Sequence, residues 1–197
     1  MKILWLSLFL SLFLACTNPF STRGVQDPEL SGDSGSKNNL QTDPDSLLAK
    51  MKYAFQFENV NYYQEILADS SQVGKNLLFV PQKDEKFRFA GWNLKDEFNY
   101  FSNLINRFNV KSVRLSFSNI QPWNTTPTST DTVQSQMDYL ITVQFRTKTE
   151  KYQGQSIFYL LRSPLSKWYI FRWEDLKLES SGSDSTWSTL KATFRYN

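Results

Sequence analysis

The chain has 197 residues, 40% of them hydrophobic and 16% aromatic, and its formal net charge is +3. One domain of ordinary size fits this length, and the 16 Phe, 9 Tyr and 6 Trp are enough to fill its core. So small a net charge gives no reason to expect nucleic acid as a partner. The absence of histidine excludes reactions that need an imidazole base, together with the common histidine metal sites.

The first residues predict export. Lys2 precedes an apolar and serine run over residues 3–14, and Ala15 stands directly before Cys16, the only cysteine. A positive start, a short apolar stretch and a small residue before the cleavage point are typical of a secretory signal. The run is shorter than the about 18 residues expected of a membrane-spanning helix, so we expect it to be cleaved.

Residues 12–16, Leu-Phe-Leu-Ala-Cys, resemble the lipobox of bacterial lipoproteins, with Phe13 where that pattern usually has an aliphatic residue. The resemblance implies a signal peptide over residues 1–15, a diacylglycerol on the Cys16 thiol and a further acyl chain, such as palmitate, on the freed amine. Several chains together give stable anchoring. The alternative is a plain secretory signal with an incidental cysteine. Thr17 is not the aspartate that marks inner-membrane retention in Gram-negative sorting, so the analogy implies the outer membrane, facing the periplasm.

Two regions follow the signal. Residues 16–43 contain the lipidated amino end and a stretch rich in Ser, Gly, Asn, Asp and Pro, which we predict to be a disordered tether because it has little apolar surface to bury. Residues 44–197 are predicted to form one domain.

Three helices are predicted in the first half of this domain. Asp43-Pro44 suits a helix start, and Asn59 and Asn93 can each cap a further helix. The second helix is expected to end at residues 69–71. The three apolar stripes consist of Leu47, Leu48, Met51, Ala54 and Phe55, then Val60, Tyr63, Ile66 and Leu67, then Leu94, Phe98, Phe101, Leu104, Ile105 and Phe108.

Strands are predicted mainly in the second half. Residues 77–80 are a short apolar run, and apolar residues alternate with polar ones over residues 113–118 and 141–146. The Thr- and Ser-rich segment 122–135 is expected to be a loop, and residues 151–154 a turn. Strands over residues 155–162 and 167–176 follow, joined by a tight connection. Residues 187–194 fit either a closing helix or a final strand.

This order of elements predicts an α+β fold, with N-terminal helices packed on one face of a strongly bent antiparallel sheet. The domain resembles the cone-shaped nuclear transport factor 2-like superfamily, which includes the SnoaL-like proteins. The resemblance is carried by residues 48–57, 63–69, 79–81, Trp92 with Glu97, 168–175 and 186–195. It implies a small-molecule pocket at the open end of the cone, where enzymes of the group place acidic, tyrosine or histidine side chains.

Asp69, Tyr63 and Asp138 are the candidate acid–base residues for such a pocket, because a carboxylate in an apolar site can have its pKa raised and act near neutral pH. Each also has a structural interpretation, which we prefer. Asp69 can cap a helix, Tyr63 can lie in the core, and Asp138 can be solvated at a strand end. No residue is therefore assigned as catalytic.

Asp175 and the tryptophans are expected to be structural. Asp175 can accept hydrogen bonds from a neighbouring turn or pair with Lys191 or Arg195, and most of the tryptophans are expected in the core. Trp123 lies in a polar segment and is expected at the rim. The sequence has no phosphate-binding loop, nucleophile elbow or calcium loop, so we predict no cofactor and no metal.

Two functions stay open. The first is a lipid-anchored envelope protein with a non-enzymatic binding or scaffold domain, whose partner is an envelope protein, a hydrophobic small molecule or a polysaccharide. The second is an isomerase- or cyclase-type enzyme. It requires a deep pocket with a buried carboxylate within hydrogen-bond reach of a tyrosine, and a cone filled by Phe and Trp side chains would exclude it. A homodimer through the exposed sheet face is a further expectation, since such dimers are common in the superfamily.

Overall fold

The structure, a computed structural model, describes residues 41–127, 129–178 and 185–196. The predicted signal peptide, Cys16 and the tether up to residue 40 lie outside the described residues. The helices are α2 (Pro44–Gln56), α3 (Val60–Glu65), α4 (Ser70–Val73), the 3-10 helix η2 (Lys83–Phe89), α5 (Leu94–Asn106) and α6 (Trp187–Phe194). The strands are β1 (Leu78–Val80), β2 (Val110–Ser118), β3 (Asn124–Thr126), β4 (Ser129–Phe145), β5 (Thr149–Arg162) and β6 (Trp168–Leu176).

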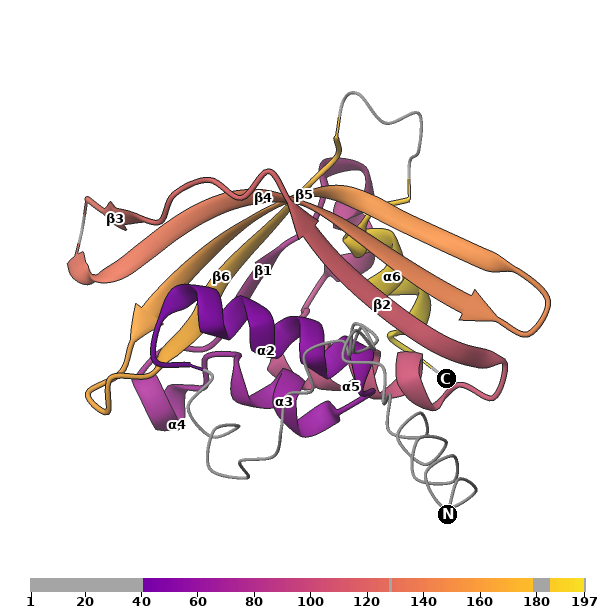
Figure 1. The fold of residues 1–197 in the computed structure, drawn as a ribbon, viewed down its shortest axis with the longest axis horizontal. Coiled ribbons are helices and arrows are strands. Elements are labelled where there is room, and N and C mark those ends of the chain that lie inside the picture. Colours follow the sequence, from indigo (N-terminus) through magenta and orange to yellow (C-terminus); the bar gives the residue numbers. More distant parts are fainter. Residues whose placement is uncertain (1–40, 128, 179–184, 197) are drawn as a thin grey trace, which may run out of the picture. The chain divides into compact units, whose positions relative to one another are not determined.

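The strands form one curled sheet with the helices on one of its faces (Figure 1). The strand order is β1-β6-β5-β4-β2, in which β1 runs parallel to β6, the other pairs are antiparallel, and β3 pairs with the first part of β4. Helices α2, α3 and α5 lie below the arch of the sheet, and α6 lies beneath its other half (Figure 1). The predicted α+β architecture is confirmed.

The helix starts are confirmed because their signals are local. Asp43 caps α2 and accepts a hydrogen bond from the Ser46 amide at 2.8 Å, and Asn93 caps α5 in the same way. All five residues of the first predicted stripe are buried. Two ends were predicted wrongly. Asp69 begins α4, since α3 already ends at Glu65, and Phe108 lies beyond α5 with 80% of its surface exposed.

The predicted loop over residues 122–135 is wrong. Residues 124–126 form β3, and residues 129–135 form the first part of β4. Within β4, Thr132 to Ser135 pair with Phe158 to Leu161 of β5. Threonine is β-branched and suits a strand when a partner strand is available, whatever the polarity of the segment. The predicted turn over residues 151–154 is also wrong, because β5 begins at Thr149 and the chain reverses just before it.

Gly154 explains the second error. It lies inside β5 opposite Tyr139, and a Cβ atom there would come within 2.5 Å of the Tyr139 hydroxyl oxygen and 2.6 Å of the Leu176 carbonyl oxygen. This glycine therefore serves a close approach between strands and not a turn.

Gln41, the first described residue, packs against the domain, although the sequence pattern placed it in the tether. Gln41 is 4% exposed, its carbonyl accepts from the Trp168 amide at 2.8 Å, and its Oε1 accepts from Lys50 Nζ at 2.8 Å. Its Nε2 donates to the Glu65 carbonyl at 2.8 Å. The folded part therefore begins no later than Gln41. No helix in the described residues is both long and apolar enough to cross a membrane.

Candidate functional site

A carboxylate at the start of α5 lies in the interior and accepts three hydrogen bonds. The Tyr63 hydroxyl of α3 and Lys191 Nζ of α6 each lie 2.5 Å from Glu97 Oε1, and Trp92 Nε1 donates to Oε2 at 2.9 Å. Glu97, Tyr63 and Lys191 are all 0% exposed. Asn93 sets the first turn of α5, which directs Glu97 inward near the positive end of the helix dipole. Buried charge is tolerated here because each oxygen has a donor.

The ammonium group of Lys191 is held among aromatic rings. Its Nζ lies 3.5 Å from the ring centroid of Trp173 and 3.6 Å from that of Phe79, within the range of cation–π attraction. Burial lowers the pKa of Lys191 to about 8, and the negative charge of Glu97 opposes this shift. Burial, and then the charge of Glu97, raises the pKa of Tyr63 well above its ordinary value. Tyr63 therefore stays protonated at neutral pH and donates to Glu97.

A second buried carboxylate, Asp175 of β6, holds the start of α6. Its Oδ2 accepts from the Ser188 amide at 2.6 Å and from the Ser188 hydroxyl at 2.5 Å, and its Oδ1 accepts from the Tyr139 hydroxyl at 2.6 Å. The Trp187 amide in turn donates to the Tyr139 oxygen at 2.6 Å. These contacts satisfy two of the amide groups that a helix start leaves without partners. Burial raises the pKa of Asp175, and the hydrogen bonds from Ser188 and Tyr139 oppose this.

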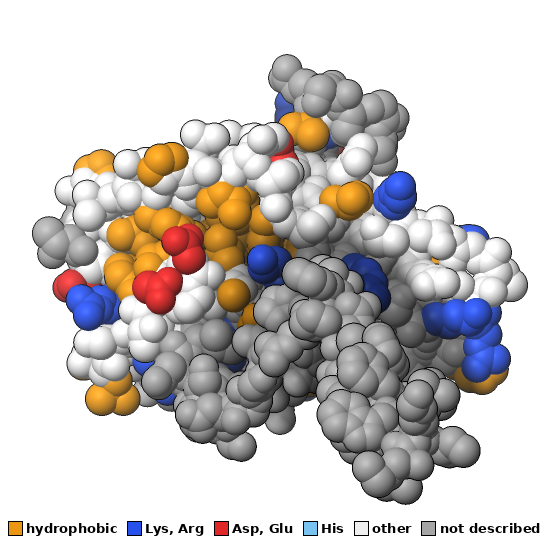
Figure 2. Space-filling model, in the orientation of Figure 1, with side chains coloured by type: hydrophobic (Ala, Val, Ile, Leu, Met, Phe, Trp, Pro, Cys, Tyr) orange, Lys and Arg blue, Asp and Glu red, His pale blue; other side chains and the backbone are white. Residues whose placement is uncertain are grey.

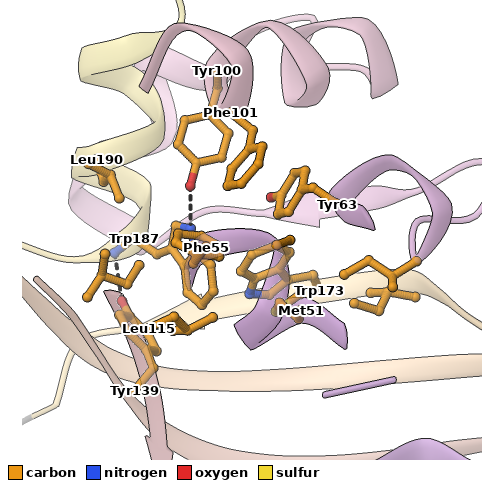
Figure 3. Close-up of a cluster of buried hydrophobic side chains, with 14 of the residues drawn as sticks. Met51, Phe55, Tyr63, Tyr100, Phe101, Leu115, Tyr139, Trp173, Trp187 and Leu190 are labelled. Carbon is orange, nitrogen blue, oxygen red and sulfur yellow. Dashed lines mark hydrogen bonds between the residues drawn. The ribbon is translucent and has the colours of Figure 1, made fainter. Parts of the chain in front are cut away.

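Aromatic rings pack against one another in the interior of the domain (Figure 3). The Tyr63 and Phe101 rings stack with centroids 4.1 Å apart, and the Trp173 and Trp187 rings meet edge to face at 4.3 Å. Trp187 Nε1 donates to the Tyr100 hydroxyl at 2.9 Å. All five of these side chains are 0% exposed. The interior at the two carboxylates is packed with side chains.

The structure does not bring the three predicted candidates together. Asp69 caps α4 through a hydrogen bond from the Ser71 amide at 2.8 Å, and these contacts with Ser71 lower its pKa. Tyr63 is a core residue. Asp138 lies within β4, not at its entrance, and accepts from Asn119 and Gln155 at 2.6 and 3.1 Å. Asp69 thus has the capping contact, and Tyr63 the core position, that the structural interpretation predicts.

Two charged members of the interior were not candidates in the sequence analysis. Glu97 appeared there only as part of the family resemblance, and Lys191 appeared only as a partner for Asp175. The structure pairs Lys191 with Glu97, and Arg195 with Asp96 at 3.1 Å. The sequence does hint at a buried charge here, because Lys191 is the one charged residue among the apolar side chains of residues 187–194.

The tryptophans divide between core and edge. Trp173 and Trp187 are 0% exposed, as expected of core residues. Trp123 is half-buried in the segment before β3, and its Nε1 donates to Asp45 Oδ1 of α2 at 2.9 Å. The side chain expected at the rim thus joins the β3 region to the first turn of α2.

No family model and no curated protein matches the sequence. Solved structures do match. A nuclear transport factor 2-like superfamily protein from Salmonella enterica has a TM-score of 0.52 at 10% identity, covering 76% of this chain and 99% of its own. A conserved protein from Planctomyces limnophilus has a TM-score of 0.53 at 10% identity, covering 72% and 96%.

A third similar structure comes from Novosphingobium aromaticivorans, and its name proposes an aromatic ring hydroxylase. It has a TM-score of 0.52 at 13% identity and covers 71% of this chain and 90% of its own. Likeness at such low identity establishes the fold. The domain therefore has the nuclear transport factor 2-like fold that the sequence predicts, with helices packed on a curled, open sheet.

Proposed function

We propose that this chain is a lipid-anchored protein of the bacterial cell envelope whose domain binds a ligand without transforming it. The observation that carries the non-enzymatic role is the packing of the interior. Glu97 and Asp175 are 0% and 1% exposed, and fully buried Phe, Tyr and Trp side chains fill the space around them. General acid–base catalysis requires contact between such groups and the substrate, and this packing leaves none.

The anchoring part of the proposal rests on the first residues of the sequence. Lys2, the apolar run over residues 3–14 and Ala15-Cys16 have the order of a lipoprotein signal, and Thr17 favours the outer membrane, facing the periplasm. Gln41, the first described residue, is held between β6 and α3, which supports a domain that the proposed tether enters from this side. A domain held at one such point can move within the reach of its tether while it stays at the membrane.

Replacing the lipidated cysteine tests the anchoring. In Cys16→Ser expressed in a Gram-negative host, we expect loss of the acyl mass and transfer of the protein from the membrane to the soluble fraction. The matched control is Thr17→Ser, which leaves the thiol in place. Unchanged mass and partitioning of Cys16→Ser would rule out acylation at this residue.

Binding without conversion is tested with envelope extracts. The full chain, purified in a non-ionic detergent, is incubated with small molecules extracted from the envelope, and the bound and free fractions are compared by mass spectrometry. We expect compounds to be retained and recovered chemically unchanged. The appearance of a product that depends on the protein would contradict the non-enzymatic role.

The enzyme alternative meets one of its two requirements, because the carboxylate–tyrosine pair is present but packed side chains surround it. Tyr63 and Glu97 form the carboxylate–tyrosine pair that an isomerase- or cyclase-type site needs, with Lys191 as a third polar group. If a product forms, Tyr63→Phe should abolish it while leaving the fold intact. Arg195→Gln, which breaks an ion pair near the surface, is the control and should have no effect on it.

A further inference from the structure

A groove lies where α2 passes beside β2, at the edge of the sheet, away from the packed interior. Its volume is about 390 Å³, within the range of small-molecule sites. Lys52, Tyr53 and Gln56 of α2 line one side, and Arg114 and Ser116 of β2 line the other. Figure 2 shows blue, basic side chains between α2 and β2 on this face.

The charge in this groove has one sign. Lys52 and Arg114 are both exposed, and no carboxylate is among the residues that line it. Several basic groups elsewhere in the described residues form ion pairs, as in Lys50–Glu65, Arg88–Glu85 and Arg172–Glu174. Neither Lys52 nor Arg114 has such a partner among the described residues. Two cations that face one groove without a counter-ion attract an anion.

The rest of the lining adds hydrogen-bond donors and apolar contact. Gln56 and Thr142 can donate from amide and hydroxyl groups, as Lys52 and Arg114 do, whereas the Ser116 hydroxyl donates to the Leu140 carbonyl at 3.4 Å. The Tyr53 ring and Leu140 supply apolar surface beside them. The groove therefore matches a group rich in acceptor oxygens that is attached to an apolar body.

We propose that this groove binds a small organic anion, in which Lys52 and Arg114 hold a phosphate or carboxylate group and Tyr53 and Leu140 contact the apolar part. This inference rests on the binding role proposed above and gives it a site and a ligand class. The anion belongs either to a soluble compound or to a lipid head group, since both present the same oxygens.

The test is a calorimetric titration of the full chain in a non-ionic detergent, with buffer and detergent blanks. Naphthyl phosphate carries the anion and an apolar body, naphthol carries the body alone, and short-chain phosphatidylglycerol represents a lipid head group. We expect naphthyl phosphate to bind and naphthol to bind at least about tenfold more weakly. Binding of the short-chain lipid as well would identify a lipid head group as the source, and its absence a soluble anion.

The decisive variant is Lys52→Gln/Arg114→Gln, whose affinity for naphthyl phosphate should fall at least about tenfold. Lys95→Gln/Lys167→Gln removes the same charge from exposed residues outside the groove and should bind as the native chain does. Equal losses in both variants, equal binding of naphthol, or no binding of naphthyl phosphate to the native chain would each overturn the proposal. Release of naphthol from naphthyl phosphate would contradict the non-enzymatic role. The measured affinities alone test whether the groove binds the anion.

Discussion

At the scale of single residues, the ion pair between Glu97 and Lys191 is the most demanding contact of the interior. Both side chains are 0% exposed, and their charge is compensated by Tyr63, Trp92 and the nearby aromatic rings. A buried pair of this kind adds little net stability over well-packed apolar residues, but removing one partner leaves an uncompensated charge. Substitution of one member of the pair should therefore lower the free energy of unfolding more than substitution of both.

Replacing the lysine alone should destabilise the fold strongly. We expect Lys191→Met to lower the free energy of unfolding by about 3–5 kcal/mol, because Glu97 then stays buried without its counter-ion. The double variant Lys191→Met/Glu97→Gln should lose less than Lys191→Met, since it removes the stranded charge. Urea unfolding is measured for the native chain, for Lys191→Met and Glu97→Gln alone, and for the double variant. A double variant that loses the sum of the two single changes would show that the pair is not coupled.

A partly buried pair provides the comparison. Arg195 and Asp96 have side chains that are 13% and 16% exposed, so water screens their attraction more than that of the buried pair. Arg195→Met should therefore lower the free energy of unfolding clearly less than Lys191→Met does under the same conditions.

At the scale of elements, α6 is joined to the sheet by hydrogen bonds that centre on one carboxylate. Asp175 of β6 accepts from the Ser188 amide and hydroxyl, and Tyr139 of β4 links Asp175 to the Trp187 amide. The position of α6 thus depends on contacts with β4 and β6, two strands that precede it in the sequence. Its other face covers Glu97 through Lys191.

Removal of this carboxylate should loosen α6 before the rest of the domain. In Asp175→Ala we expect a loss of about 1–3 kcal/mol for each buried donor left without a partner. Amide hydrogen exchange should become faster in α6 (Trp187–Phe194) than in α2 (Pro44–Gln56). Ser112→Ala, which removes an exposed hydroxyl on β2, is the control. Equal acceleration in both helices would mean that Asp175 does not hold α6 in particular.

The same elements show what the sequence can and cannot predict. Helix starts at Asp43 and Asn93 and the buried stripe of α2 follow from neighbouring residues, so pattern alone identified them. The partners of Thr132 and Gly154 lie on strands more than ten residues away, so their strand positions were read as loop and turn. The Glu97–Lys191 pair joins residues 94 positions apart, and nothing near either residue specifies the other.

At the scale of the whole molecule, the buried tyrosines set the response to alkaline pH. Burial, as the first cause, raises the pKa of Tyr63, Tyr100 and Tyr139 well above the ordinary value. A group whose pKa is higher in the folded chain stabilises the fold below its unfolded pKa and loses this contribution above it. The unfolded value is about 10 for tyrosine, so stability should fall as the pH rises beyond this point.

Lys191 acts in the opposite direction. Its pKa is about 8 in the folded chain, below the ordinary 10.5, so the unfolded chain binds more protons between these values and stability should rise with pH there. Urea unfolding between pH 7 and pH 12 should therefore show a rise above pH 8 followed by a fall above about pH 10. Lys191→Met should lack the rise and Tyr63→Phe should show a weaker fall. Unchanged pH profiles in both variants would contradict these assignments.

The central claim is that the space between the helices and the curled sheet is filled, so that a ligand binds outside it. A crystal structure of the chain under xenon pressure tests this most directly, because xenon enters apolar cavities and marks them. We predict no xenon and no ordered water in contact with Tyr63, Glu97 or Trp187. A xenon atom or a water molecule beside the Glu97 carboxylate would reveal an open pocket and would support the enzyme alternative.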